Sequence, residues 1–194
     1  MIFDSLGASL IYGLLRRGKI SGIGDIVIKK MDFFIAAFLV QLGLWNLSDK
    51  FPIVMEYRAY IHFLVYLLLF IGLWYNRDSK YFRIIALGVF LNFIVIFANG
   101  GRMPVSIEAL KAAGLTHLIP PLVEDKITTH QVLTSSTRLK FLADVLVLPK
   151  PYPLPKAFSV GDLLMAVGIF WLITDAMLGR VKRDDGEGEK GKNT

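Results

Sequence analysis

The chain has 194 residues, of which 54% are hydrophobic, with a formal net charge of +6 and a mean hydropathy of +0.53. This apolar fraction exceeds the roughly 45–50% of a soluble domain, and its concentration in blocks excludes an ordinary soluble core and indicates a multi-pass membrane protein. No cysteine is present, which excludes disulfide bonds and thiolate metal sites. Basic residues stand at the ends of the apolar runs, so we expect membrane lipids, and no nucleic acid, as partners.

The first apolar run, residues 2–15, is followed by the basic residues Arg16, Arg17 and Lys19. A secretory signal peptide carries its positive charges before the apolar region, so this run is not a signal peptide. It is shorter than the roughly 20 residues of a typical membrane-spanning helix. We interpret it as a short N-terminal transmembrane helix, and a helix lying in the membrane interface is the alternative.

Three further apolar runs follow, separated by short polar segments. They are residues 31–47, 59–75 and 81–98. Polar side chains inside them are few and include Gln41, His62 and Asn92. A buried asparagine in a membrane usually hydrogen-bonds between two helices, so we expect Asn92 to do so. We expect His62 to find its partner within the bundle.

The composition changes in residues 99–157, which hold seven of the eight prolines and no stretch of membrane length. Within this segment, residues 106–115 predict a short helix closed by Gly114. Residues 132–144 predict another short helix or a strand. The segment therefore separates the fourth apolar run from the last one.

The last apolar run, residues 158–178, completes the expectation of an all-α, polytopic integral membrane protein with about five transmembrane helices. We predict one membrane domain, residues 1–178, and a disordered cytoplasmic tail, residues 179–194, because the tail is charged and glycine-rich. Three basic segments hold 13 of the 22 Lys and Arg residues: 16–30, 76–83 and 179–194. The positive-inside rule places these segments in the cytoplasm, and the N-terminus and the outer segment 99–157 outside.

Two aspartates on the predicted outer side carry the candidate chemistry. Asp144 lies in the outer segment, and Asp162 lies 18 residues further on, at the start of the last run. Ser159 and Asp162 fit a helix capping box, and capping alone is one interpretation of Asp162. An acid at the entrance of a membrane helix also suggests a functional role. Two neighbouring carboxyl groups share a proton, so one can activate water while the other polarises a carbonyl; we predict Asp144 and Asp162 as the catalytic pair of an aspartic hydrolase.

The stretch Asn99-Gly100-Gly101-Arg102 leaves the membrane on the same predicted side as both aspartates. We predict that it binds substrate. Asn99 would bond a peptide backbone, the glycines would allow close approach, and Arg102 would hold a carboxylate or a lipid phosphate. A helix C-cap, with Gly100 or Gly101 in the left-handed conformation, is a compatible alternative.

The three histidines, His62, His117 and His130, are possible metal ligands together with the aspartates. They lack the spacing of zinc motifs such as H-x-x-x-H or H-E-x-x-H. No phosphate-binding or dinucleotide-binding fingerprint is present. We therefore predict no metal site and no cofactor.

Several stretches resemble known families. The opening helix with Arg16-Arg17, the NGGRMPV stretch, the LAD-x-x-x-LP segment and the final FSVGD helix together resemble an uncharacterised bacterial family of small multi-pass membrane proteins, a domain of unknown function. Residues 142–145 resemble the V-V-D-F-like segment of lipoprotein signal peptidase (signal peptidase II), an integral-membrane aspartic peptidase. Residues 158–162 resemble its F-N-x-A-D box, with Ser159 in place of the asparagine. This second resemblance implies a shared aspartic site at Asp144 and Asp162 more than a shared substrate. Our hypothesis is an endopeptidase that acts on lipid-anchored or membrane-embedded peptides.

The competing function is a non-catalytic membrane protein that binds a lipid, an ion or a protein partner. Geometry separates the two hypotheses. A hydrolase requires the two carboxyl groups within about one water molecule of each other, facing a groove that is open to lipid. A binding protein predicts two separate carboxylates, each with its own cap or ion pair.

Overall fold

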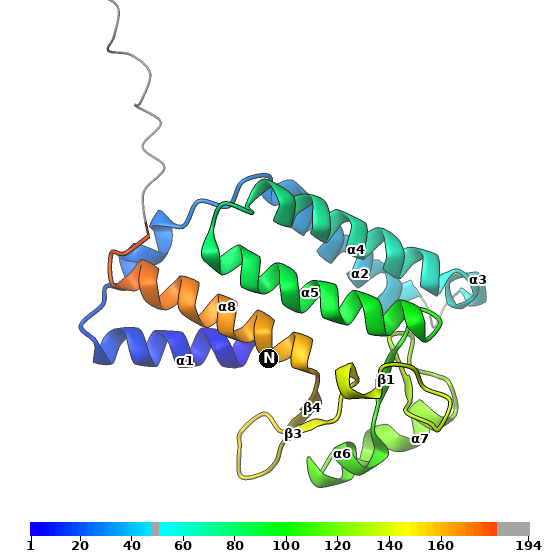
Figure 1. Ribbon diagram of the computed structural model, residues 1–194. Helices are drawn as coiled ribbons and strands as arrows, with labels where there is room; N and C mark the ends of the chain where they lie inside the picture. Colours follow the sequence, from blue (N-terminus) through cyan, green and yellow to red (C-terminus); the bar gives the residue numbers. More distant parts are fainter. Residues whose placement is uncertain (48–50, 182–194) are drawn as a thin grey trace, which may run out of the picture.

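The computed structural model describes residues 1–47 and 51–181, and five long helices that lie side by side dominate it (Figure 1). These helices are α1 (Ile2–Leu15), α2 (Met31–Leu47), α4 (Arg58–Tyr75), α5 (Lys80–Ala98) and α8 (Val160–Met177). Each begins and ends within two residues of the apolar run that predicts it. The chain is therefore mostly helical, as the sequence indicates.

Three of these helices, α4, α5 and α8, are long and apolar enough to cross a membrane. α1 has 14 residues and α2 has 17. At 1.5 Å per residue these lengths are about 21 and 25 Å, against about 30 Å for the hydrocarbon core of a bilayer. Of the five predicted spans, three are thus supported by length and composition, and spanning by α1 and α2 stays a prediction.

The long helices pack in two groups, with α1 along α8 and α8 along α5 in one, and α2 along α4 in the other (Figure 1). Glycines allow α5 and α8 to approach closely. A Cβ atom on Gly88 would lie 2.5 Å from the carbonyl oxygen of Gly161, and one on Gly161 would overlap the Asn92 side chain. This contact brings the start of α8 against the middle of α5.

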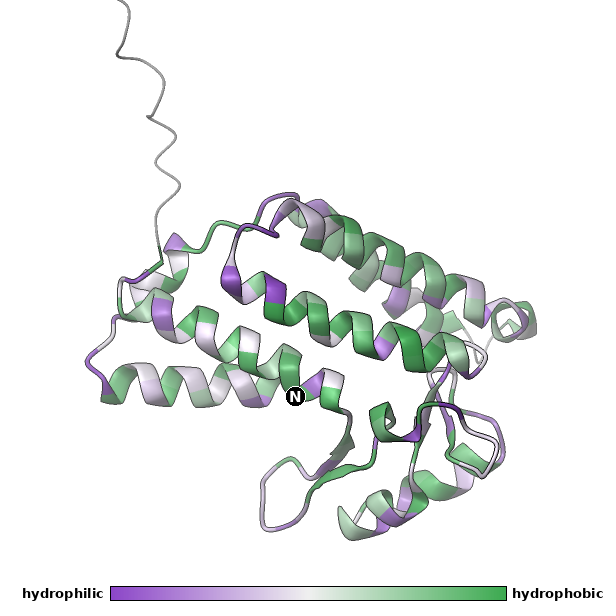
Figure 2. Ribbon diagram, in the orientation of Figure 1, coloured by the Kyte–Doolittle hydropathy of each residue, from purple (hydrophilic) through white to green (hydrophobic). Residues whose placement is uncertain are grey.

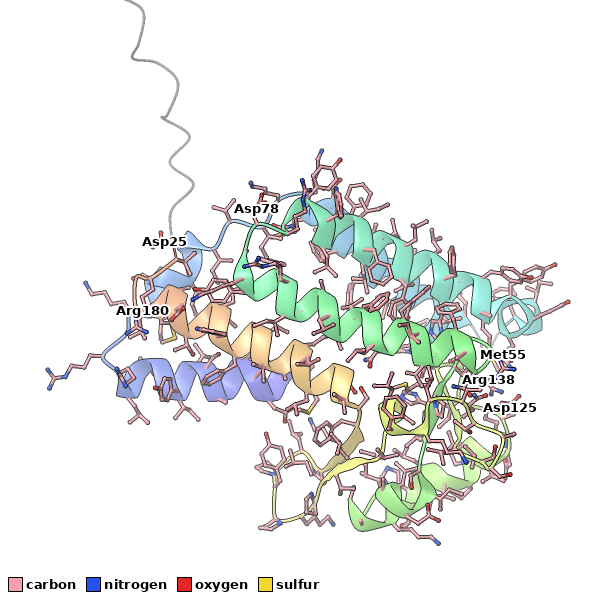
Figure 3. All side chains as sticks on the ribbon, in the orientation of Figure 1. Asp25, Met55, Asp78, Asp125, Arg138 and Arg180 are labelled. Carbon is pink, nitrogen blue, oxygen red and sulfur yellow. The ribbon has the colours of Figure 1, made fainter. Side chains whose placement is uncertain are left out.

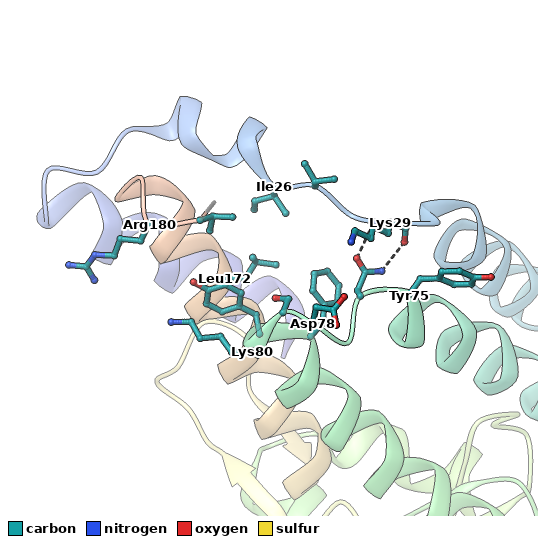
Figure 4. A pocket seen from close by; sticks show the side chains of 13 residues that line it. Ile26, Lys29, Tyr75, Asp78, Lys80, Leu172 and Arg180 are labelled. Carbon is teal, nitrogen blue, oxygen red and sulfur yellow. Dashed lines mark hydrogen bonds between the residues drawn. The ribbon is translucent and has the colours of Figure 1, made fainter. Parts of the chain in front are cut away.

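The basic connecting segments gather at one end of the bundle. Lys19 N donates to the carbonyl oxygen of Met177 at 2.7 Å, which ties the end of α1 to the end of α8. The Asn76 side chain accepts from Lys29 N at 2.9 Å and donates to Lys29 O at 2.8 Å, as the dashed lines in Figure 4 mark. The same end carries Asp25, Asp78 and Arg180, labelled in Figure 3.

The outer segment lies at the opposite end of the bundle. There, Asp4 near the start of α1 accepts hydrogen bonds from Tyr152 Oη at 2.7 Å and from Lys156 Nζ at 2.5 Å. Figure 2 shows mostly hydrophobic helices between more hydrophilic ends. The structure thus separates the basic segments from residues 99–157, and which end faces the cytoplasm stays a prediction.

Short elements complete the described chain. They are the 3₁₀ turns η1 (Ile20–Asp25), η2 (Thr116–Leu118) and η3 (Lys140–Leu142), the helices α3 (Pro52–Glu56), α6 (Ile107–Ala112) and α7 (Ile119–Val123), and the strands β1 (Met103–Val105), β2 (His130–Val132), β3 (Leu146–Leu148) and β4 (Lys156–Phe158). β1 pairs with β2 in parallel, and β3 pairs with β4 antiparallel. The strand pairs depart from the all-α prediction, because pairing partners far apart in sequence leave no local signal.

Two local predictions in the outer segment are confirmed. α6 begins after Ser106, whose Oγ accepts from the backbone N–H of Ala109 at 3.2 Å, and Gly114 follows the helix with φ +74°. η3 lies inside residues 132–144, where we predict a short helix or a strand. Residues 182–194, most of the predicted disordered tail, lie outside the described residues.

Candidate functional site

A cavity of about 430 Å³ lies where the helices meet the outer segment. α2, α4 and α5 supply most of its wall, and residues of the outer segment and Asp162 of α8 supply the rest. Its apolar lining includes Phe34, Ala37, Phe38, Trp45, Val65, Tyr66, Leu69, Ile96 and Met103, and its polar lining is Gln41, His62, Asn92, Thr129, His130, Asp144 and Asp162. Both predicted catalytic aspartates therefore line one cavity, although 18 residues separate them in sequence.

Asp162 is held in a closed hydrogen-bond network at the start of α8. Its Oδ2 accepts from the backbone N–H of Ser159 at 3.1 Å, and its own N–H donates to Ser159 Oγ at 3.0 Å, so the predicted capping box is confirmed. Its Oδ1 accepts from Asn92 Nδ2 at 3.0 Å, and Ser159 Oγ donates to Asn92 Oδ1 at 2.9 Å. Two N–H donors and a helix N-terminus thus surround this carboxyl group, and all three stabilise a negative charge.

Asn92 therefore links two helices, as its position inside an apolar run predicts. It is buried on α5, and both ends of its amide are used by residues at the start of α8. The neighbouring Gly161 leaves the space that the Asn92 side chain fills. The Asp162 carboxylate is consequently fixed from both helices and points along their interface into the cavity.

Asp144 occupies a different environment. Its side chain is 8% exposed, and its backbone is anchored beside β1 because Asp144 N donates to Pro104 O at 2.9 Å and Ser106 N donates to Asp144 O at 3.1 Å. Burial raises the pKa of Asp144, the charge of Asp162 adds to the rise, and His130 opposes it. Its Oδ1 has no hydrogen-bond partner within residues 1–47 and 51–181. Burial therefore favours the protonated form of Asp144 more than it is favoured in an ordinary exposed aspartate.

His130 connects Asp144 to the rest of the cavity wall. Its Nε2 lies 3.4 Å from Asp144 Oδ2, and its Nδ1 hydrogen-bonds Thr129 Oγ1 at 2.7 Å. From the sequence, His130 is expected only as a possible metal ligand. Among the residues that the structure describes, no three His, Cys, Asp or Glu side chains are arranged to hold a metal ion.

Gln41 is a further polar residue of the cavity. It lies on α2, far from the two aspartates in sequence, and lines the same cavity. Its Nε2 is buried without a hydrogen-bond partner in the described chain. A buried amide without a partner costs roughly 1–3 kcal/mol, which a bound acceptor group would recover. The only signal in the sequence is that Gln41 is a polar residue inside an otherwise apolar run.

The four predicted substrate-binding residues lie outside this cavity. Asn99 Nδ2 donates to Val95 O at 2.7 Å and to Arg138 O at 2.9 Å, so its side chain ties the end of α5 to the outer segment. Gly100 and Gly101 have φ of +77° and +87°, which confirms the predicted left-handed cap.

The fourth of them, Arg102, forms an ion pair with Asp125, which also lies 3.7 Å from Arg58. Asp125 and Arg138 are seen beside the end of α5 in Figure 3. Only Gly101 touches the cavity wall, because its carbonyl oxygen accepts from His62 Nδ1 at 2.8 Å. Substrate contact by these four residues stays a prediction.

Comparison with known proteins gives a family and one relative. Residues 25–174 match the family described as "Family of unknown function (DUF5317)". An uncharacterized protein of Thermotoga maritima is 28% identical over 170 residues, which are 88% of this chain and 88% of that protein. No solved structure matches the chain. The predicted resemblance to an uncharacterised family is confirmed, and these comparisons give no support to a likeness to lipoprotein signal peptidase.

Proposed function

Because the chain belongs to DUF5317, a family of unknown function, we propose its activity from the cavity alone: it is a membrane-embedded aspartic hydrolase that acts at the outer membrane face. The observation that carries the proposal is that Asp144 and Asp162 line one cavity from unlike surroundings. Asp162 receives two N–H donors at a helix N-terminus, whereas Asp144 is buried with a raised pKa. In aspartic hydrolysis one carboxyl group accepts a proton from water while the other donates one, and the unlike surroundings of the two aspartates support such a division of roles.

The two carboxyl groups then take different roles. Asp162 accepts a proton from a water molecule as the water oxygen forms a bond to the scissile carbonyl carbon. Asp144 donates a hydrogen bond and then its proton to the carbonyl oxygen, which stabilises the charge that develops there. Collapse of the tetrahedral intermediate breaks the C–N bond, the proton taken from water passes from Asp162 to the leaving amine, and one hydroxyl of the intermediate gives its proton back to Asp144. His130 helps to return Asp144 to its protonated state, because its Nε2 faces the carboxyl group.

The cavity wall suggests the class of substrate. Aromatic and aliphatic side chains make up most of the lining, and two of them, Phe38 and Trp45, are 61% and 54% exposed on the surface of α2. An exposed apolar edge on a membrane helix faces lipid, so a substrate would enter from the bilayer. The unpartnered Gln41 amide would donate to a backbone carbonyl of the substrate. We propose an apolar peptide with a lipid anchor or a membrane segment as the substrate.

The test uses the purified full chain and an internally quenched peptide that carries an N-terminal fatty acyl chain. Asp144→Asn and Asp162→Asn should each lower kcat by about 10²–10⁴-fold, the usual effect of removing a general acid or base. Both variants should keep their helical circular dichroism. Asp175→Asn, an equal charge change near the other end of α8, is the matched control and should keep most of the activity in the fraction that folds.

A second measurement does not depend on the choice of cleavable peptide. An acyl peptide with a statine-type hydroxyl in place of the scissile carbonyl mimics the tetrahedral intermediate and should bind the native chain more tightly than either Asn variant. Gln41→Met, which keeps the side-chain volume, should weaken this binding about fivefold to tenfold without loss of thermal stability.

The capping role alone makes a different prediction. If Asp162 only caps α8, Ser159→Ala and Asp162→Asn should lose the same amount of stability, about 1 kcal/mol, and the statine peptide should bind all variants equally. That result would reject the hydrolase and favour the non-catalytic alternative, a protein that binds a lipid, an ion or a partner.

A further inference from the structure

A groove of about 520 Å³ runs between α1 and α8 toward the basic end of the bundle, far from the aspartate cavity. Val167 and Phe170 line its apolar part, and Trp171 continues it toward the end of α8. The ring of Phe170 packs at 5.7 Å from that of Tyr12 on α1, which closes the floor of the groove. Trp171 and Val167 are 42% and 43% exposed, so this apolar surface faces outward from the bundle.

Two guanidinium groups stand at the end of this groove. Arg16 follows α1 and has no ion pair in the described chain, and Arg180 follows α8 with a side chain that is 59% exposed. Arg180 reaches Asp175 Oδ1 only at 3.5 Å, and Asp175 is already engaged by Tyr81 Oη at 2.7 Å and Lys80 Nζ at 3.3 Å. Both arginines therefore keep donors for another anion.

Arg180 lines both this groove and the neighbouring pocket at the same end. Figure 4 shows that pocket, and in it the Arg180 side chain points away from Lys29 and Tyr75. The surroundings favour an anion, because residues 16–32, 76–83 and 175–181 contain nine Lys and Arg and four Asp.

A third polar group lies deeper in the groove. Thr174 is 4% exposed and lines the groove, and its hydroxyl has no hydrogen-bond partner among the residues that the structure describes. It lies in the last turn of α8, whereas Arg180 follows the end of that helix, and Val167 lies seven residues before Thr174, roughly 10 Å deeper along the helix. The order along the chain from the basic end is thus the Arg180 cation, the Asp175 carboxylate that is already bonded to Tyr81 and Lys80, the Thr174 hydroxyl and then apolar surface.

We propose that this groove binds one anionic phospholipid. The phosphate lies between Arg16 and Arg180, an ester carbonyl accepts from the Thr174 hydroxyl, and an acyl chain covers Val167 and Phe170. This order matches a lipid in a leaflet, where the head group lies at the interface and the chains lie deeper. A soluble phosphate would use the arginines and leave the apolar surface and the threonine without a role.

The experiment measures the thermal stability of the full chain in dodecyl maltoside micelles as dioleoyl phosphatidylglycerol is added. Dioleoyl phosphatidylcholine provides the same acyl chains, and glycerol 3-phosphate provides the anionic group without them. We expect saturable stabilisation by phosphatidylglycerol only. Arg16→Gln should weaken the apparent Kd about fivefold, which corresponds to about 1 kcal/mol for one basic residue at an anionic lipid.

Arg17→Gln is the matched control, because Arg17 carries the same charge one residue further on and does not line the groove. It should change the apparent Kd less than twofold. Thr174→Val should leave the lipid-free melting temperature unchanged or raise it, since it removes a buried hydroxyl without a partner, and should still weaken phosphatidylglycerol binding.

Three results would overturn the proposal: equal stabilisation by both lipids, equal loss in Arg16→Gln and Arg17→Gln, or equal stabilisation by glycerol 3-phosphate. The first would mean a non-selective lipid surface, the second a diffuse charge effect, and the third a site for free anions. Neither the binding nor its failure depends on Asp144 or Asp162.

Discussion

The surroundings of Asp144 and Asp162 are formed partly by residues close in sequence and partly by residues far away in sequence. The Ser159–Asp162 capping box spans three positions, so a local pattern predicts it correctly. The contact of Asp162 with Asn92 joins residues 70 positions apart, and the approach of His130 to Asp144 depends on how the outer segment folds. The sequence therefore singled out both carboxyl groups as candidates, whereas their unequal environments and the positions of His130 and Gln41 in the same cavity wall required the tertiary arrangement.

The raised pKa of Asp144 predicts a pH dependence of stability. A carboxyl group whose pKa is higher in the folded than in the unfolded chain stabilises the fold fully below the unfolded value, about 3.9, and loses that contribution as pH rises through the folded value. Asp144→Asn mimics the protonated form and removes this dependence. We expect the melting temperature of Asp144→Asn, relative to that of the native chain, to rise from about pH 4 upward.

The groups that face Asp144 provide the control for this measurement. His130 opposes the rise in pKa and Asp162 supports it, so His130→Gln should steepen the pH dependence and Asp162→Asn should flatten it. A relative melting temperature that falls with pH would show that Asp144 is stabilised as an anion, which would contradict its role as the proton donor.

At the scale of helices, the site depends on how closely α5 and α8 pack. A Cβ atom on Gly88 would lie 2.7 Å from Met165 Cγ and 2.9 Å from Met165 N, in addition to its contact with Gly161. Small residues commonly allow such approaches between membrane helices. The apolar runs predicted the long helices well, because each run is a continuous local signal. The apolar runs could not predict this pairing, since two other glycines of the long helices, Gly7 and Gly43, have nothing within 4 Å of the position of an added Cβ atom.

Gly88→Ala should therefore destabilise the chain by roughly 1–3 kcal/mol, because the added methyl group separates α5 from α8. It should also lower hydrolysis of the acyl peptide, since Asn92 would no longer reach Asp162. Gly43→Ala on α2 is the matched control: nothing lies within 4 Å of its Cβ position, so it should be neutral or stabilising by up to about 1 kcal/mol. Unfolding in mixed micelles with increasing dodecyl sulfate measures both, and equal effects would mean that the α5–α8 contact has no special tightness.

At the scale of the whole molecule, the two ends of the bundle differ in charge and in content. The basic segments 16–30 and 76–83 lie together at one end, and the outer segment and Asp162 of α8 lie at the other. The count of Lys and Arg predicts this division without any structure, because it depends on composition alone. The count leaves open whether α1 and α2 cross the bilayer, since both are shorter than its hydrocarbon core.

The packing of α1 leads to a prediction about the number of spans. Asp4 contacts Tyr152 and Lys156 at the outer end of the bundle, while Lys19 N bonds Met177 O at the basic end. α1 and the residues after it therefore extend over the same length as α8, one of the three helices long enough to cross a membrane. If α8 crosses the bilayer, α1 crosses it too, with the bilayer thinning locally to match its shorter apolar stretch.

The absence of native cysteine makes this prediction directly measurable, because each introduced cysteine is the only thiol in the chain. Phe3→Cys replaces an 80% exposed side chain at the outer end of α1, and Arg17→Cys lies just beyond its other end. A membrane-impermeant maleimide should label Phe3→Cys in right-side-out vesicles and Arg17→Cys in inverted ones. Lys111→Cys in α6 should behave like Phe3→Cys, and Lys29→Cys like Arg17→Cys. Labelling of Phe3→Cys and Arg17→Cys from the same side would place α1 in the membrane interface, and exchanged sides would reverse the orientation that the basic residues predict.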